Sequence, residues 1–129
     1  MNKPISSCME KHVVSVGVED TAERVREVFD IHQLTCVPVI DAQGQCFGVL
    51  SATDLIHFCN SRENPKSEHA WEMCTHQIIE VSVDLSIREA SELMVKHNIH
   101  HLLVVEDNQL KGIVSSIDLI GEFLKQSAD

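Results

Sequence analysis

The chain of 129 residues contains an internal repeat, and this feature limits its fold more than any other. When the sequence is aligned with itself at an offset of 65 positions, residues 13–18 match 78–83 and residues 34–41 match 99–106. A turn that is one residue shorter changes the offset to 64, and residues 48–56 then match 112–120. Self-similarity at a fixed period indicates a duplicated supersecondary unit. The two halves of the chain are therefore expected to share one fold.

Each half contains an amphipathic helix directly after a short β-type run. The apolar and His positions recur at helical spacing, as Ala22, Val25, Val28, Phe29 and His32 in the first half and as Ile87, Ala90, Leu93, Met94 and His97 in the second. Thr21 and Ser86 mark the two helix starts, and residues 86–89 have the pattern of a capping box. These features predict one helix at the same place in each repeat.

A β-hairpin and a second helix follow in each half. The hairpins pair residues 37–41 with 46–50 and 102–106 with 110–114, across turns that contain Gly44 or Asp107-Asn108. The second helices are expected at about 52–59 and 116–125. The predicted fold class is α+β, built from two β-α-β-β-α units of the α/β type. Residues 1–60 form the first repeat, 61–68 a polar linker and 69–129 the second repeat.

Neither repeat is large enough to bury its apolar surface alone. A unit of about 60 residues buries only part of the surface that its unfolded chain exposes, so the two copies are expected to pack together. Two similar copies would be related by a pseudo-two-fold axis and would enclose a cleft, which is a natural place for a small ligand. The chain is therefore predicted to be one two-repeat module.

Composition excludes several classes of function. The formal charge is −10, with 10 Lys and Arg against 20 Asp and Glu, so nucleic acid and anionic membrane are poor partners. No apolar stretch approaches the roughly 20 residues of a membrane helix, and the first residues lack the apolar core of a signal peptide. The 5 cysteines are odd in number and contain no C-x-x-C pair, which does not suggest a disulfide framework. We expect a soluble protein of the reducing cytoplasm.

The same strand-turn-helix motif stands in both repeats. It is Gly48-Val49-Leu50-Ser51-Ala52-Thr53-Asp54 in the first copy and Gly112-Ile113-Val114-Ser115-Ser116-Ile117-Asp118 in the second. Glycine permits a close backbone approach, and a Ser hydroxyl with the N–H groups of a helix start suits a phosphate. A carboxylate one turn into the helix can accept hydrogen bonds from both hydroxyls of a ribose. The motif has the chemistry of a nucleoside-phosphate site.

These two motifs resemble those of the CBS domain family, whose repeats carry the pattern G-h-x-[ST]-x-x-[DN]. The resemblance runs from about Ile5 to Gln126. It implies a stand-alone tandem CBS pair, or Bateman module, that binds an adenosyl ligand such as AMP, ADP, ATP or S-adenosylmethionine in the cleft between its repeats. It also implies a flat homodimer formed through the helices. Because the sequence contains no catalytic or transport domain, the module is expected to regulate a partner protein in trans, without an obligatory cofactor.

The resemblance also assigns roles to individual residues. Asp54 and Asp118 would hold ribose, while Ser51, Thr53, Ser115 and Ser116 would lie near ribose or phosphate. His100 and His101 would supply the cations for phosphate in the second copy. Adenine would lie between apolar residues, which are Val14, Val37 and Pro38 in one copy and Ile79 and Leu102 in the other. Thr35 and Cys36 replace the two histidines in the first copy, so two equal nucleotide sites are not expected.

Structural roles compete with each of these assignments. A carboxylate in the first turn of a helix is favoured by the helix dipole by about 0.3 to 1 kcal/mol, which alone would account for Asp54 and Asp118. The two Ser residues would then be ordinary N-caps. His97, His100 and His101 suggest a metal, but His97 matches His32 of the other copy and both fit helix-end positions. We predict no metal site.

Three functional hypotheses remain open, of which the first is the ligand sensor described above. No nucleophile is set apart with a base, so we predict that the chain has no catalytic residues and is not an enzyme. The alternative to a ligand sensor is a ligand-free interaction or scaffold module, which the strong negative charge favours because an acidic protein repels polyphosphates. The third reading is redox sensing, which would require one exposed thiol with a depressed pKa.

Overall fold

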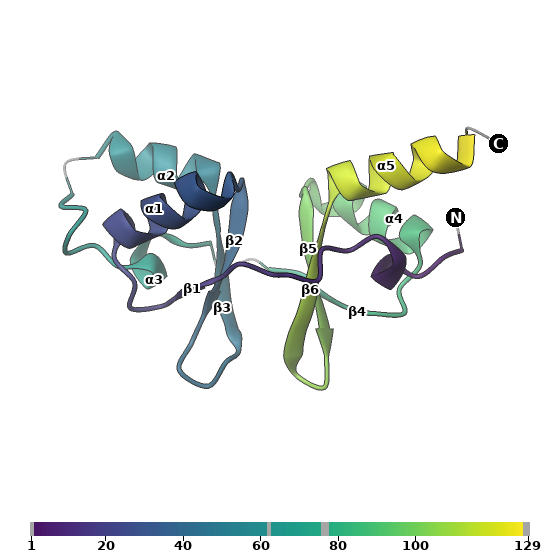
Figure 1. Ribbon diagram of the computed structural model, residues 1–129, viewed down its shortest axis with the longest axis horizontal. Helices are drawn as coiled ribbons and strands as arrows, with labels where there is room; N and C mark the ends of the chain where they lie inside the picture. Colours follow the sequence, from purple (N-terminus) through teal and green to yellow (C-terminus); the bar gives the residue numbers. More distant parts are fainter. Residues whose placement is uncertain (1, 62, 76–77, 128–129) are drawn as a thin grey trace. The chain divides into compact units, whose positions relative to one another are not determined.

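The computed structural model of the protein describes residues 2–61, 63–75 and 78–127. The chain forms two compact units. The first-repeat unit is Val14–Ile78, and the second-repeat unit combines Ile79–Asp129 with Met1–Val13. Figure 1 follows the chain through both units.

The first-repeat unit packs two helices on one face of a three-stranded sheet (Figure 1). Its elements are β1 (Val16–Gly17), α1 (Ala22–His32), β2 (Cys36–Ile40), β3 (Cys46–Ser51), α2 (Ala52–Cys59) and the short α3 (Ala70–Met73). Strand β2 is central, parallel to β1 and antiparallel to β3. Its buried core contains Val16, Val25, Val28, Phe29, Val37, Val39, Leu50 and Ala70.

The second-repeat unit has the same plan. Its elements are the 3-10 helix η1 (Ile5–Ser7), β4 (Glu80–Ser82), α4 (Ile87–His97), β5 (His101–Glu106), β6 (Gln109–Ser115) and α5 (Ser116–Ser127). Strand β5 is central, parallel to β4 and antiparallel to β6. The buried core contains Ile5, Ile87, Ala90, Met94, Leu102, Val104, Val114 and Leu119. Within the described residues, no helix is both long and apolar enough to cross a membrane.

The predicted α+β fold and the duplicated β-α-β-β-α order are confirmed, with shifts of a residue or two at the element ends. Helices α1 and α4 begin and end at matching positions, and each is followed by a residue in the left-handed region, Gln33 (φ 52) or Asn98 (φ 53). The second hairpin turn has positive φ at both Asp107 and Asn108, as a tight two-residue turn requires. The strands β2 and β5 start one residue earlier than predicted, so they include Cys36 and His101.

The segment that begins each half of the sequence belongs to the compact unit of the other half. The N-terminal segment reaches the second-repeat unit, where Ile5 is 0% exposed and Glu10 is bridged to Ile113. Residues 69–75 belong to the first-repeat unit, where Ala70 is 0% exposed and Thr75 is bridged to Val49. The compact units therefore divide the chain differently from the repeat in the sequence.

Candidate functional site

Each unit contains a junction where a strand passes directly into a helix. Ser51 is the last residue of β3 and the N-cap of α2. Its backbone N–H donates to Asp54 Oδ2 at 2.8 Å, and its Oγ accepts from the backbone N–H of Asp54 at 3.2 Å. Ser115 and Asp118 repeat this arrangement at the start of α5, with distances of 2.8 Å and 3.1 Å. The capping role that competed with the ligand role is thus present in both repeats.

Gly48 and Gly112, the glycines of the two motifs, each lie against another segment of the chain. A Cβ atom on Gly48 would lie 2.7 Å from the backbone oxygen of Thr75 and 2.8 Å from Cys74 Sγ. A Cβ atom on Gly112 would lie 2.6 Å from Met9 Sδ and 2.9 Å from the backbone oxygen of Glu10. Such distances leave no room for a side chain. Each glycine therefore lets another segment of the chain come close to its backbone. This segment is residues 74–75 at Gly48 and residues 9–10 at Gly112.

A third residue joins each Ser–Asp pair. His101 lies opposite Ser115 across the β5–β6 ladder, and Cys36 lies opposite Ser51 across β2–β3. Residues directly opposite each other in an antiparallel pair share one face of the sheet. The first junction is defined here as Cys36, Ser51 and Asp54, and the second junction as His101, Ser115 and Asp118. Neighbouring backbone bonds match as well, from Ala52 N to Thr35 O and from Ser116 N to His100 O, both at 2.9 Å.

The third residues of the two junctions are uncharged near pH 7. Burial and the neighbouring His100 lower the pKa of the His101 imidazole below its ordinary value, although Asp118 opposes this shift. Burial, with smaller effects of Asp54 and Cys46, raises the pKa of the Cys36 thiol to about 12. His101 would therefore need to take up a proton before it could act as the cation that was predicted for a phosphate.

The apolar residues that were predicted to hold adenine fall into two groups. Val37, Pro38 and Leu102 are fully or almost fully buried within the units, so they have little surface to offer a ligand. Val14 and Ile79 are half-buried and pack at the edge of the two cores.

The remaining polar candidates differ in exposure. Thr53 and His100 are exposed, and Ser116 is half-buried. His32 and His97 are exposed at their helix ends, as their matching positions suggested. Among the residues that the structure describes, no three His, Cys, Asp or Glu side chains are grouped so as to hold a metal ion.

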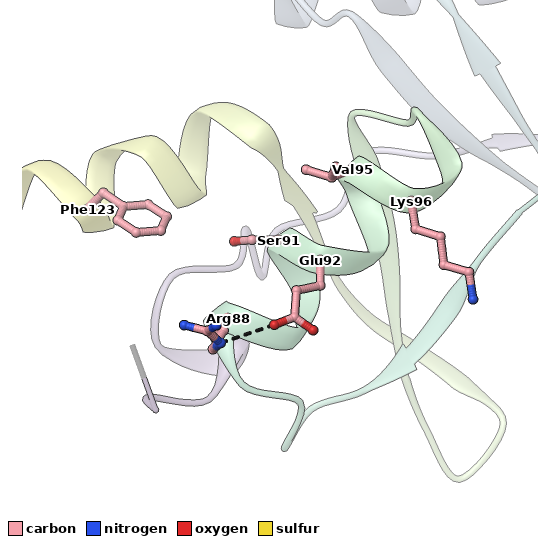
Figure 2. A pocket seen from close by; sticks show the side chains of 6 residues that line it. All are labelled: Arg88, Ser91, Glu92, Val95, Lys96 and Phe123. Atoms are coloured by element: carbon pink, nitrogen blue, oxygen red, sulfur yellow. Dashed lines mark hydrogen bonds and ion pairs between the residues drawn. The ribbon is translucent and has the colours of Figure 1, made fainter.

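A groove between α4 and α5, shown in Figure 2, was not predicted from the sequence. Its volume is about 430 Å³, and it is lined by Arg88, Ser91, Glu92, Val95, Lys96 and Phe123. Arg88 Nε donates to Glu92 Oε1 at 3.1 Å along one edge, while Val95 is 82% exposed and Phe123 is 44% exposed. Ile117, Ile120 and Leu124 of α5 are exposed too. The signal was available in the sequence, because residues 117–124 place apolar side chains on more than one face of the helix.

The matching groove of the first-repeat unit is smaller. It lies between α1 and α2, has a volume of about 180 Å³, and is walled by α1 and α2 residues together with Ser61, Glu63 and Pro65. The linker segment is held to the start of α1 by bonds from Glu23 N to Pro65 O at 3.0 Å and from Ala22 N to Glu68 O at 2.8 Å. The linker thus covers part of this groove, whereas the α4–α5 groove is lined by its own two helices.

Two curated proteins are similar to the chain in sequence. Inosine-5'-monophosphate dehydrogenase of Halobacterium salinarum is 33% identical over 106 residues, which are 81% of this chain and 21% of that protein. The CBS domain-containing protein YhcV of Bacillus subtilis is 25% identical over 125 residues, which are 96% of this chain and 89% of that protein. The chain thus spans about a fifth of the dehydrogenase and most of YhcV.

Solved structures share the fold. The CBS domain pair of MJ0100, in complex with 5'-methylthioadenosine and S-adenosyl-L-methionine, has a TM-score of 0.86 and 19% identity, covering 98% of this chain and 99% of the other. CBSX2 in complex with AMP has a TM-score of 0.85 and 20% identity, covering 97% and 98%. The family model described as the CBS domain matches residues 5–61 and 70–125, which are the two repeats of the sequence. On this evidence of sequence, repeat and fold, the chain belongs to the CBS domain family.

Proposed function

We propose that the protein is a regulatory module that binds an adenosyl ligand, AMP, ADP, ATP or S-adenosylmethionine, at the Ser–Asp junctions of its repeats. The observation that carries this proposal is the duplicated junction, in which a Ser–Asp pair stands at a helix N-terminus beside the start of a hairpin strand. Two proteins of the same fold, MJ0100 and CBSX2, hold adenosyl compounds, which supports the choice of ligand.

The capping geometry leaves each aspartate able to do more than cap. In both junctions the backbone N–H of the Ser donates to Oδ2 of the Asp. A carboxylate has two oxygens and about four acceptor sites, so Oδ1 of Asp54 or Asp118 can accept from ribose hydroxyls while the cap is kept. The N–H groups of the helix start favour a phosphate nearby, with Ser51, Thr53, Ser115 and Ser116 as further donors.

Regulation would follow from differential binding. A ligand shifts an equilibrium between two arrangements only by the difference in its affinity for them. We therefore propose that occupancy changes the surface that the module presents to a partner protein in the cytoplasm, without any catalysed reaction and without an obligatory cofactor. The match to inosine-5'-monophosphate dehydrogenase supports a regulatory role only, because it covers about a fifth of that enzyme.

A thermal-shift panel tests the sensor proposal. AMP, ADP, ATP, S-adenosylmethionine, NAD and GTP are compared with buffer, and any hit is titrated by calorimetry. A ligand at 100 times its dissociation constant stabilises the folded state by about 2.7 kcal/mol, which gives a visible rise in melting temperature. We expect at least one adenosyl compound, but not GTP, to give this rise. A panel without any shift would contradict the sensor proposal.

Substitutions then test the aspartates. Asp54→Asn and Asp118→Asn each keep an oxygen for the helix cap while removing the charge that would bind ribose. We expect at least one of them to weaken nucleotide binding tenfold or more. Asp107→Asn removes the same charge from an exposed hairpin turn and is the matched control. Unchanged binding by both junction variants would contradict the ribose assignment.

A second candidate function is a ligand-free interaction module that acts as a homodimer through its helices. The exposed apolar side chains of the α4–α5 groove favour it, because contiguous apolar surface on a protein of this size marks an interaction site (Figure 2). Light scattering coupled to gel filtration should give twice the chain mass of 14.4 kDa. Phe123→Glu should lower that mass, and Phe58→Glu on α2 is a comparison at the equivalent end of the other groove. A monomer at all concentrations would contradict the dimer.

A further inference from the structure

Two segments of the chain dock on the two units through equivalent backbone bonds. These docking segments are residues 3–10, in the second-repeat unit, and residues 68–75, in the first-repeat unit (Figure 1). The offset of 65 that aligns the two halves also aligns them. Their bonds to the helix starts are Ile5 N to Leu85 O (2.7 Å) with Ile87 N to Lys3 O (2.8 Å), and Ala70 N to Asp20 O (2.8 Å) with Ala22 N to Glu68 O (2.8 Å). The backbone bonds therefore do not distinguish one docking segment from the other.

The side chains at equivalent positions of the docking segments differ in charge and in size. Lys3 aligns with Glu68, and Ile5 aligns with Ala70. Lys3 Nζ lies 3.2 Å from Glu122 Oε1 of α5. Ile5 and Ala70 are each 0% exposed, in the two separate cores. Each unit thus holds a side chain of a different charge and one of a different size at the same two places.

Glu122 makes the charge of the docking segment important in the second-repeat unit. It is 5% exposed, and within the described part of the chain it is the charged residue that is buried. The equivalent residue of α2, 64 positions earlier, is Phe58, which has no charge. A buried carboxylate is unfavourable without a partner of opposite charge, and a second carboxylate beside it is more so. Lys3 provides that partner, whereas Glu68 at the same place would provide a second carboxylate.

We propose that Lys3 and Glu122, called here the selectivity pair, assign the N-terminal docking segment to the second-repeat unit and exclude the other docking segment from it. The excluded arrangement is one in which each segment docks on the unit of its own half of the sequence. The fixing of one pairing among alternatives is the best-attested role of buried polar and ionic groups. Size acts in the same direction, because Ala70 in the place of Ile5 would leave a cavity in the second core.

This assignment decides which side chains border the two junctions. The pKa values of Cys8 and Cys74 are raised, mainly by burial, and Asp118 and Asp54 respectively are among the smaller causes. Each thiol therefore lies near the aspartate of one junction. Met9 and Cys74 also lie against the motif glycines. An exchange of the docking segments would replace these neighbours at both junctions, so the selectivity pair keeps the two junctions different from each other.

Charge reversal tests the selectivity pair. Lys3→Glu places a carboxylate beside Glu122, so hydrogen exchange in α4, β5 and β6 should become about tenfold faster or more, while α1, β2 and β3 change little. Combining Lys3→Glu with Glu122→Lys restores opposite charges and should recover most of the lost protection. Arg88→Glu, alone and combined with Glu92→Lys, is the matched control, because that pair of the same unit has side chains 73% and 64% exposed. The control variants should change exchange by less than about threefold.

Cross-linking tests which segment docks on the second-repeat unit. A carbodiimide joins an amine to a neighbouring carboxylate with the loss of one water, and mass spectrometry identifies the joined peptides within a single chain. The wild type should give a link from Lys3 to Glu122. The variant Lys3→Glu, Ile5→Ala, Glu68→Lys, Ala70→Ile exchanges charge and size, and it should give a link from position 68 to Glu122 instead. Glu68→Lys with Ala70→Ile, which keeps Lys3 and Ile5, is the control and should keep the wild-type link.

Each result supports or overturns the proposal. If Lys3→Glu leaves the exchange of the second-repeat unit unchanged, or if Glu122→Lys fails to recover the protection that Lys3→Glu loses, the selectivity pair is wrong. If the fourfold variant folds but gives no link from position 68 to Glu122, other residues assign the docking segments. If the fourfold variant does not fold, the charge reversals decide. Neither experiment uses a nucleotide, so the adenosyl proposal stands or fails separately.

Discussion

The first-repeat unit and the second-repeat unit share their backbone plan but differ where side chains meet solvent. Matching helices, hairpins and Ser–Asp junctions occur in both. The groove between the helices is partly covered by the linker in the first unit and is larger in the second, about 180 Å³ against 430 Å³. The first junction has Cys36 at the position where the second junction has His101. The comparison teaches that the same backbone packing can carry two different surfaces for ligands and partners.

The largest effect should come from the core of the second-repeat unit. Ile5 is 0% exposed there, so Ile5→Ala should destabilise the protein by about 2 to 5 kcal/mol through lost burial and a cavity. Hydrogen exchange should show faster opening of α4, β5 and β6 than of α1, β2 and β3, although residue 5 belongs to the first half of the sequence. Ile31→Ala, at a position 69% exposed, should change stability by less than about 0.5 kcal/mol. Equal loss of protection in both units would show that the N-terminal segment does not stabilise the second unit selectively.

The next effect concerns the two motif glycines. Gly48→Ala and Gly112→Ala should each destabilise by about 1 to 3 kcal/mol, because the new methyl group collides with Thr75 or with Met9 and Glu10. Denaturant unfolding measures both. Gly121→Ala, in α5 with open space around it, is the matched control and should stabilise by about 0.5 to 1 kcal/mol. Neutral Gly48 and Gly112 variants would show that these segments do not pack as closely as described.

A smaller effect is the pH dependence of each junction. The folded pKa of His101 is below its unfolded value, so its contribution is intact above about pH 6.5 and is lost as the pH falls through the folded value. The folded pKa of Cys36 is raised from 9.0 to about 12, so its contribution is intact below pH 9 and is lost as the pH rises toward 12. Unfolding curves of His101→Asn and Cys36→Ser against wild type should differ in slope at the acidic end and the alkaline end respectively. The same slopes in variant and wild type would contradict the described burial.

The smallest effect is on thiol reactivity. The thiolate is the reactive form, and Cys36 with its pKa of about 12 holds almost none of it at pH 8. Mass spectrometry after brief alkylation of the folded protein should therefore find Cys36 modified far more slowly than the exposed Cys59. Denatured protein, in which both thiols are exposed, is the control. Rapid labelling of Cys36 would contradict its raised pKa and would support the redox-sensing hypothesis at the first junction.

Much of the local structure could be predicted from the sequence. The helices α1 and α4 follow from apolar spacing and from caps at Thr21 and Ser86, which are interactions within a few residues. The hairpins follow from their turns, and the duplication follows from the offset of 65. The Ser–Asp pairs were also identified, since their members are only three positions apart along the chain. These features depend on contacts that are short along the chain.

Tertiary structure decided what depends on residues far apart. Ile5 meets Ile87 in one core, and Gly112 meets Met9, although about a hundred positions separate that second pair. No local pattern encodes which repeat a preceding segment packs against. The charge state of His101 is decided in the same way, because burial by distant elements, and not the residue type, lowers its pKa. The sequence alone determined the repeated elements and the motif, and packing between distant segments determined the partners of the glycines and the electrostatics of the two junctions.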